Sequence, residues 1–330
     1  MAHILAIETS CDDTCAAVLD GPRVLSNVIS SQARVHARFG GIVPEVASRK
    51  HLELINPVIE AALEDADRGL ETIDAIAVTT KPGLIGALLV GVNSAKSIAA
   101  ATGKPLIPVD HLQGHVAAAF LEPDPLEPPF LALIASGGHT LLAEVHDHGR
   151  FAIAGQTLDD AAGEALDKAA RLLGLGFPGG PLLEREAEAG DPDAFPMPIA
   201  MSHDGSLDFS FSGLKTALVY AVADLGEERA RERRADLAAS FQGAVVGQLV
   251  AKLRRALAAG GWEAVALGGG VAANALLRER AAALCAERGA RLKLVPPELC
   301  TDNAAMIGSA ARFADPIDYP DYLDLDAAAR

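Results

Sequence analysis

The chain has 330 residues, of which 50% are hydrophobic and 22% charged, and its formal net charge is −16. This length is sufficient for two domains with sizeable cores, and the composition is typical of a globular protein rather than a disordered or fibrous one. The acidic balance argues against extensive contacts with nucleic-acid phosphates, but it leaves room for a local basic patch.

No signal peptide is expected, because the apolar run near Met1 soon reaches Glu8. No membrane span is expected either, because the longest apolar run is interrupted by Asn93 and Lys96. The four cysteines form no Cys-x-x-Cys pair, which fits a reducing cytoplasm.

The first predicted unit is a strand, a polar turn and a return strand. Residues 3–7 and 15–19 have strand character around a turn rich in hydroxyl and acidic residues. The same design recurs at 130–135 and 141–145, around a Ser-Gly-Gly turn. One such unit in each half indicates a duplicated architecture with a ligand between the halves. Taken alone, the glycine hairpin is weak support, because glycines also serve turn geometry.

Between these hairpins the chain alternates helices and strands. Helical periodicity covers 47–66, a strand follows at 75–79, and a small-residue helix runs to 101, where Gly103 ends it. This order predicts parallel α/β layers. A proline-rich linker at 122–129 predicts lobes of residues 1–127 and 128–330, with the last helix packing back toward the first lobe.

The segment after the apolar stretch 105–109 has the spacing of a metal site. If Asp110 caps a helix there, His111 and His115 lie one turn apart on the same face. Asp302, near the C-terminus, can supply a third ligand. Two imidazoles and one carboxylate leave coordination positions open, as in catalytic metal sites.

Two other interpretations of this motif remain. The histidines can simply line a partly buried helix, although imidazoles on such a small, apolar helix would need partners. The motif also differs from the His-Glu-x-x-His motif of metalloproteases. Leu112 stands in place of the general-base Glu, and Gln113 cannot act as a base, which disfavours peptide hydrolysis.

In the second half, Thr157 is expected to cap a helix whose first turn contains the pair Asp159-Asp160. Glu164 and Lys168 then form an ordinary pair four residues apart. Asp167 has no such structural explanation on a small, apolar helix.

Two glycine-rich segments predict close approach of backbone to a ligand. The loop 174–181 is too glycine-rich for a simple connector. At 264–274, a strand, three glycines and the start of a helix offer amides to an anion. Because the Lys-Ser/Thr ending of a P-loop is absent, nucleoside and phosphate binding remain equally open. An amphipathic helix is predicted to end at Gly260-Gly261, and the acidic tail after Asp315 is expected to be solvated.

Two groups of cationic residues stand out in this acidic chain. The second group is interpreted as a solvated helix face, because glutamates are interleaved with it; the first is left open as a partner surface. The first comprises Arg34, His36, Arg38, Arg49, Lys50 and His51, and the second Arg229, Arg231, Arg233, Arg234, Arg254 and Arg255.

Taken together, these segments resemble the bacterial TsaD family, also called Gcp or YgjD, the tRNA adenosine threonylcarbamoyltransferases. The similarity extends over nearly the whole chain, and the blocks 157–168 and 209–216 are the most specific. Many relatives carry Glu where this chain has Gln113. The motifs that carry the resemblance are residues 8–12, 41–45, 111–115, 136–140, 157–168, 177–181, 209–216, 268–271 and 301–303.

The resemblance implies a duplicated, two-lobed α/β fold of the actin, sugar-kinase and heat-shock ATPase type, with the active site in the cleft between the lobes. It implies one divalent metal ion per chain, iron or zinc, held by His111, His115 and Asp302. The residues that it implies for binding the nucleotide-linked substrate are Ile134, Ala135, Ser136, Gly137, Gly138, Asp167, Gly180 and Asn274.

The implied reaction transfers a threonylcarbamoyl group from threonylcarbamoyl-AMP to N6 of adenosine-37, beside the anticodon, in tRNAs that read ANN codons. The implied partners are a TsaB-like paralogue and a TsaE-like ATPase, with tRNA as the acceptor. The adenine amine is a weak nucleophile, so the reaction needs an activated carbonyl and a proton acceptor. Asp13 is a candidate acceptor, although Asp12 and Asp13 can equally be turn residues.

Two alternatives to the transferase remain. A non-catalytic nucleotide-binding interaction module would explain the glycine turns but would leave His111, His115 and Asp302 without a purpose. A metalloprotease would need the base that Leu112 does not provide.

Overall fold

The computed structural model describes residues 3–201 and 205–329. The chain divides into two compact units. Unit 1 contains Met1–Pro128, Asp147–Arg150 and Glu298–Arg330, and unit 2 contains Pro129–His146 and Phe151–Pro297. The sequence predicts lobes of residues 1–127 and 128–330. The boundary after Pro128 lies in the proline-rich linker, but the segment from Glu298, which includes Asp302, groups with unit 1.

Unit 1 is built on a five-stranded mixed sheet with the order β3-β2-β1-β4-β5. β1 pairs antiparallel with β2 and parallel with β4, so it joins a meander to a parallel half. Buried aliphatic residues fill β1, β2 and β4, whereas β3 has only one buried residue. The strands are β1 (His3–Glu8), β2 (Asp13–Asp20), β3 (Arg23–Ser31), β4 (Ala75–Lys81) and β5 (Leu106–Asp110).

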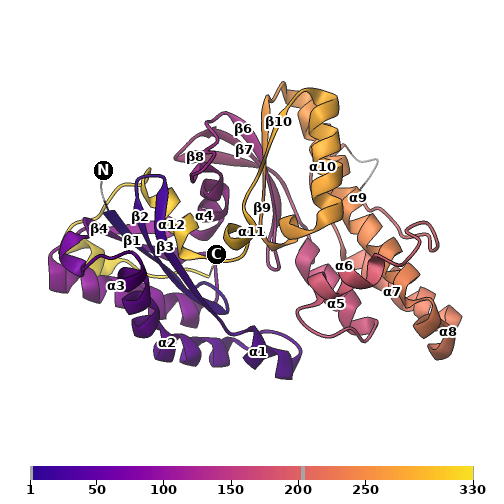
Figure 1. Cartoon of the computed structure of the whole chain (residues 1–330), viewed down its shortest axis with the longest axis horizontal. Coiled ribbons are helices and arrows are strands. Elements are labelled where there is room, and N and C mark those ends of the chain that lie inside the picture. Colours follow the sequence, from indigo (N-terminus) through magenta and orange to yellow (C-terminus); the bar gives the residue numbers. More distant parts are fainter. Residues whose placement is uncertain (1–2, 202–204, 330) are drawn as a thin grey trace. The chain divides into compact units, whose positions relative to one another are not determined.

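Helices complete unit 1 (Figure 1). Helices α2 and α3 pack against each other, and their apolar faces join the strands in one core with Leu5, Ile76 and Tyr322. Helix α12 contacts β1, β2 and α4, which brings the C-terminal segment onto the sheet. The helices are α1 (Ala33–His36), α2 (Pro44–Asp65), α3 (Ile85–Thr102), α4 (His111–Ala117) and α12 (Ala304–Ala311), with short 3-10 turns η1 (Ala37–Phe39), η2 (Leu70–Thr72), η3 (Ala118–Phe120) and η5 (Asp321–Asp324).

Within residues 3–201 and 205–329, α3 is the one helix long and apolar enough to cross a membrane by length and composition alone, with a mean hydropathy of 1.3. Asn93 and Lys96 therefore do not interrupt it as strongly as the sequence suggests. The helix packs on α2 and β4 within unit 1.

Unit 2 repeats the same sheet. Its order, β10-β9-β6-β7-β8, is that of unit 1 strand for strand: β6 is antiparallel to β7 and parallel to β9. This repetition confirms the predicted duplication. The strands are β6 (Phe130–Ala135), β7 (Thr140–Asp147), β8 (Arg150–Gln156), β9 (Ala264–Gly268) and β10 (Arg291–Leu294).

The long amphipathic helix α9 (Arg234–Gly260) ends where Gly261 adopts a left-handed conformation, as predicted. It packs against α6 and α10. The other helical segments from unit 2 to the junction with unit 1 are α5 (Ala162–Leu172), α6 (Gly179–Ala187), α7 (Ser212–Leu225), α8 (Glu227–Glu232), η4 (Gly270–Ala273), α10 (Ala275–Arg288) and α11 (Pro297–Cys300).

Two predictions about local structure are wrong. Thr157 does not cap a helix, because its backbone N–H bonds to the Thr140 carbonyl and that of Leu158 to the Phe209 carbonyl; α5 begins only at Ala162. The segment after Asp315 is not simply solvated, since Tyr322 is fully buried in the core of unit 1. The edge strands β3 and β8 escaped prediction because their polar residues obscure the alternation.

Candidate functional site

Helix α4 positions the two histidines as the spacing predicts. β5 ends at Asp110, whose Oδ1 accepts hydrogen bonds from the backbone N–H groups of Leu112, at 2.8 Å, and Gln113, at 3.4 Å. This cap starts the helix at His111. His111 and His115 are both buried, and their ring centroids are 4.7 Å apart.

Asp302 reaches the same place from the C-terminal segment. Asn303 caps α12 by accepting a hydrogen bond from the Met306 N–H at 3.0 Å, which fixes the chain just after Asp302. Asp302 Oδ1 lies 3.3 Å from His115 Nε2 and 3.6 Å from His111 Nε2. One ligand atom from each of the three residues lies within 4.8 Å of the others.

A buried carboxylate orients His111. Glu8, at the end of β1, has its Oε2 2.9 Å from His111 Nδ1, and Thr79 donates a hydrogen bond to the same oxygen at 2.7 Å. Ser10 Oγ lies 3.1 Å from His111 Nδ1. Such a carboxylate keeps the proton on Nδ1 and directs Nε2 toward Asp302, as the partners of metal-bound histidines do.

Carboxylates outnumber cationic groups around this cluster. Burial opposes ionisation of His111, but the carboxylates of Asp302 and Glu8 outweigh it and raise its pKa to about 9. Burial would raise the pKa of Glu8, yet His111 lowers it overall. Burial, followed by the charges of Asp12 and Asp302, raises the pKa of Asp13 to about 7.

These residues fit a divalent cation. His115 Nε2 is buried and makes no hydrogen bond, although a carboxylate oxygen lies 3.3 Å away. Nitrogen and carboxylate donors suit zinc or ferrous iron, and a cation there would offset the mutual repulsion among Asp12, Asp13 and Asp302. The spacing of His111 and His115 suggests a metal site, and the fold adds the third donor by bringing Asp302 close to both histidines.

In unit 2, hydrogen bonds between Ser136 and His139 stabilise the turn after β6. The Ser136 N–H donates to the His139 carbonyl at 2.7 Å, and the His139 N–H donates back to Ser136 Oγ at 3.1 Å. Gly163, at the start of α5, packs so closely that a Cβ there would lie 2.6 Å from the Ser136 carbonyl oxygen. By contrast, a Cβ on Gly137 or Gly138 would meet nothing within 4 Å.

Asp167 and Asn274 each secure a helix start in unit 2. Asp167 Oδ1 accepts from the N–H groups of Gly179, at 2.7 Å, and Gly180, at 3.2 Å. Asn274 caps α10 by accepting from the Leu277 N–H at 3.0 Å and donates to Gln242 Oε1 at 3.1 Å. Both predicted binding residues therefore also have structural partners.

The remaining predicted binding residues lie at the same end of the sheet in unit 2. Ile134 and Ala135 are buried at the end of β6, where Ile134 pairs with Gly268 of β9. A Cβ on Gly269 would collide with the Ala135 carbonyl oxygen, and its φ of 85° also favours glycine. Gly269 thus allows the chain after β9 to lie close to the end of β6.

Sequence reasoning missed several supporting residues. The sequence pattern places Glu8 only in a turn, although a carboxylate that ends an apolar strand is a signal of a buried partner. Asp159 was assigned to a helix, but its carboxylate accepts hydrogen bonds from Ser210 Oγ, Ser212 Oγ and the N–H groups of Phe211 and Ser212. Asp159 thereby ties two loops of unit 2 together.

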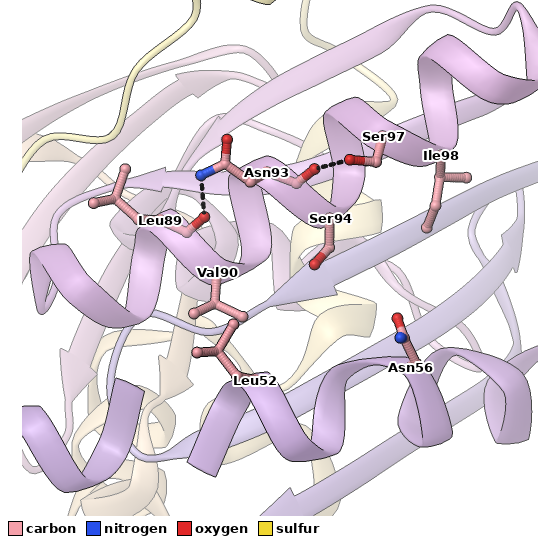
Figure 2. A pocket seen from close by; sticks show the side chains of 8 residues that line it. All are labelled: Leu52, Asn56, Leu89, Val90, Asn93, Ser94, Ser97 and Ile98. Atoms are coloured by element: carbon pink, nitrogen blue, oxygen red, sulfur yellow. Dashed lines mark hydrogen bonds between the residues drawn. The ribbon is translucent and has the colours of Figure 1, made fainter. Parts of the chain in front are cut away.

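A groove of about 470 Å³ lies elsewhere, between α2 and α3 in unit 1 (Figure 2). Its lining includes Leu52, Leu89 and Asn93, and Asn93 donates a hydrogen bond back to the Leu89 carbonyl at 2.7 Å. No titratable side chain lines the groove, so it is unsuited to group-transfer chemistry.

Comparisons with known proteins cover nearly the whole chain. Residues 23–309 match the family described as TsaD, tRNA N6-adenosine threonylcarbamoyltransferase. A Clostridium botulinum protein named tRNA N6-adenosine threonylcarbamoyltransferase is 51% identical over 312 residues, which cover 94% of this chain and 92% of that one. A Clostridium perfringens protein of the same name is 52% identical over 317 residues, with the same two coverages.

Solved structures at low identity share the fold alone. A HypF structure superimposes with a TM-score of 0.64 at 16% identity, covering 94% of this chain and 46% of HypF. Component A of the (R)-2-hydroxyglutaryl-CoA dehydratase of Acidaminococcus fermentans gives 0.57 at 16% identity, covering 95% and 98%. The ROK hexokinase of Thermus thermophilus gives 0.50 at 18% identity, covering 94% and 97%. The predicted two-lobed actin-like and sugar-kinase fold class is therefore confirmed.

Proposed function

Because the chain belongs to the TsaD family and is therefore a transferase that modifies tRNA at N6 of adenosine, we propose the finer chemistry as follows. The donor is threonylcarbamoyl-AMP, and the acceptor is adenosine-37 in tRNAs that read ANN codons. The adenine nitrogen forms a bond to the carbamoyl carbon, the bond from that carbon to the phosphate oxygen breaks, and AMP leaves. The observation that carries this proposal is the match over residues 23–309 together with the convergence of two histidines and Asp302.

We propose that His111, His115 and Asp302 hold one divalent ion, Fe²⁺ or Zn²⁺. Support comes from the buried, unbonded Nε2 of His115 and from the Glu8 carboxylate that directs the His111 ring. With a divalent ion bound, these three residues would place a Lewis acid that could polarise a carbonyl and stabilise developing negative charge. Glu8 and Thr79 keep the imidazole in the tautomer that such binding requires.

The donor adenylate is proposed to lie on the glycine loops of unit 2. Open space beside Gly137, Gly138 and Gly180 supports this, because a packing role would not require glycine at these three positions. The backbone amides there can approach the donor closely. The other residues proposed for this subsite are Ile134, Ala135, Ser136, Asp167 and Asn274.

Asp13 is the proposed proton acceptor. The attacking nitrogen must lose a proton as its bond to the carbamoyl carbon forms. The pKa of Asp13, which burial raises to about 7, is near the working pH, the range in which a general base is most effective. Its Oδ1 is buried and has no hydrogen-bond partner, so it has capacity to accept this proton.

We also propose the partners and the cellular location that the family resemblance implies. A TsaB-like paralogue and a TsaE-like ATPase act with the chain, which works in the cytoplasm. All four cysteines are free, as a reducing compartment requires.

The test is mass spectrometry of nucleosides from unmodified tRNA. The tRNA is incubated with threonine, bicarbonate, ATP, the donor synthetase and the two partners, with and without this chain. We expect threonylcarbamoyladenosine only when the chain is present, loss of product with His111→Ala, and normal product with His146→Ala, which alters a half-exposed histidine of unit 2.

Absence of product with the complete mixture, while a known relative in place of this chain makes it, would overturn the proposal. A non-catalytic nucleotide-binding module would then be the better interpretation. Proteolysis abolished by His111→Ala would instead revive the metalloprotease, which lacks a base at Leu112.

A further inference from the structure

One surface of unit 1 is basic although the chain is strongly acidic. The segment 32–50 contains four cationic side chains and a single carboxylate, in a chain with a net charge of −16. It forms α1, η1 and the first turns of α2, which Figure 1 shows together after β3. We call the exposed side chains of Arg34, Arg38, Phe39, Ile42 and Arg49 the basic surface.

One arginine of the basic surface, Arg49, pairs with Glu45 at 2.8 Å, but the other two are placed differently. Arg34 and Arg38 are exposed and have no carboxylate partner among the described residues. Arg231 and Arg254, by contrast, pair with Glu227 at 2.6 Å and Glu287 at 2.7 Å. Exposed cations without local partners can bind external phosphates.

An exposed aromatic residue accompanies these charges. Phe39 is 60% exposed and Ile42 40%, in a turn that Gly40 closes with a φ of 68°. Exposed aromatic rings beside cations are the means by which proteins stack unpaired bases while holding the backbone.

Buried polar groups fix the basic surface to the acidic hairpin. The Gln32 N–H donates to the Asp12 carbonyl at 3.1 Å. His51 Nε2 lies 3.0 Å from the Cys11 carbonyl oxygen and its Nδ1 2.7 Å from Thr14 Oγ1. His36, which the Val43 N–H contacts at 3.3 Å, holds the turn itself. The two histidines of the first cationic group are thus buried supports rather than part of the exposed charge.

The neighbourhood of the acidic hairpin creates a problem for an RNA substrate. Asp12, Asp13 and Asp302 influence one another electrostatically, and their negative charges repel phosphates. A target base is uncharged, but the nucleotides on either side of it are not. A cationic surface beside the hairpin would hold those phosphates while the base enters.

We infer that the basic surface binds the anticodon loop of the tRNA, with Arg34 and Arg38 contacting phosphates and Phe39 stacking on an unpaired base. This inference rests on the proposed function, since it takes tRNA as the acceptor. It adds the part of the chain that holds the acceptor, which neither the metal cluster nor the glycine loops provide.

The test compares two double charge reversals that change the net charge equally. Arg34→Glu with Arg38→Glu alters the basic surface, whereas Arg229→Glu with Arg231→Glu alters the exposed face of α8. Each full-length protein, assembled with its partners, is titrated with unmodified tRNA at several salt concentrations, and tRNA KM is measured in the nucleoside assay. A third variant, Phe39→Ala, tests stacking.

We expect the first double variant to bind tRNA about 10- to 100-fold more weakly, with a salt slope smaller by about 1.4, as for two lost contacts to a single strand. The α8 variant should bind like the wild type. Arg34→Lys with Arg38→Lys should restore most of the affinity, and Phe39→Ala should weaken it about 10-fold. KM for the donor should stay unchanged in all of them.

Equal losses in the two double reversals would overturn the inference, because they would reflect net charge alone. Unchanged tRNA binding in the first variant would also overturn it, as would loss of partner assembly without loss of tRNA binding. Binding needs no turnover, so the titration judges the surface even if no modified nucleoside forms. Failure of the proposed function would appear separately, as wild-type protein that binds tRNA and makes no product.

Discussion

The two units share one sheet topology but equip it for different chemistry. In unit 1 the site consists of titratable side chains: Glu8 and His111 are buried, and the partly exposed Asp302 lies beside His111. In unit 2 the corresponding strand end carries bare backbone, with open space beside Gly137 and Gly138. The comparison teaches that two copies of one scaffold can carry different groups at the same strand end: clustered titratable side chains in one copy and bare glycine backbone in the other.

The largest effect should come from removing a ligand in unit 1. His115→Ala should lower bound metal to background and transferase activity by about 10³-fold or more, because two remaining donors hold a divalent ion poorly. Metal analysis of the purified protein and the nucleoside assay check this. His146→Ala is the matched control. Full metal content in His115→Ala would show that the cluster is not the metal site.

Ionisation of Asp13 should make the transferase activity depend on pH. As a base it acts when ionised, so activity should rise with pH through the pKa of Asp13, which is about 7 without a bound cation and lower with one. Asp13→Asn should lower the rate about 10²-fold or more and remove this rise. A pH profile of kcat/KM checks both, and a variant with normal turnover would eliminate Asp13 as the base.

The raised pKa of Asp13 also predicts that the folded protein becomes less stable as pH rises. The raised pKa means that the folded protein retains a proton that the unfolded chain releases above a pH of about 4. The associated stability is present below that pH and is lost as pH rises toward 7. Asp13→Asn should therefore unfold at a higher temperature than the wild type at pH 8, with little difference at pH 4.

In unit 2, two glycine substitutions separate ligand binding from packing. Gly137→Ala should leave stability nearly unchanged, since its Cβ enters open space, but should raise the donor KM about 10-fold if the donor lies there. Gly163→Ala should instead cost about 1–3 kcal/mol, because its Cβ would press on the Ser136 carbonyl. Unfolding by urea and donor titration distinguish the two. An unchanged donor KM in Gly137→Ala would remove this loop from the donor site.

The smallest expected effect is on stability, from removing the carboxylate of Asp159 that ties two loops of unit 2 together. Asp159→Ala should lower the free energy of unfolding by about 1 kcal/mol, because four donors lose an exposed carboxylate that water can partly replace. Asp224→Ala, on an exposed position of α7, should change it little. Equal stabilities would mean that solvent replaces Asp159.

The sequence was most informative where local rules apply. The cap at Asp110, the end of α9 at Gly261 and the alternation of strands and helices follow from side-chain chemistry and spacing. Asp302 could be proposed as a third ligand only because carboxylates suit that role; its distance from His115 depends on how distant segments pack. Thr157 shows the limit, since pairing with Phe209 and Thr140 outweighed its preference for a helix cap.

The return of the C-terminal segment to unit 1 has a consequence for biosynthesis. Ser309 Oγ bonds to the Ala117 carbonyl, and the two residues are 192 positions apart. A ribosome therefore finishes all of unit 2 before Asp302 can join His111 and His115. The nascent chain cannot bring these three residues together until synthesis has nearly ended, so a chain that stops before residue 302 lacks one of the proposed ligands.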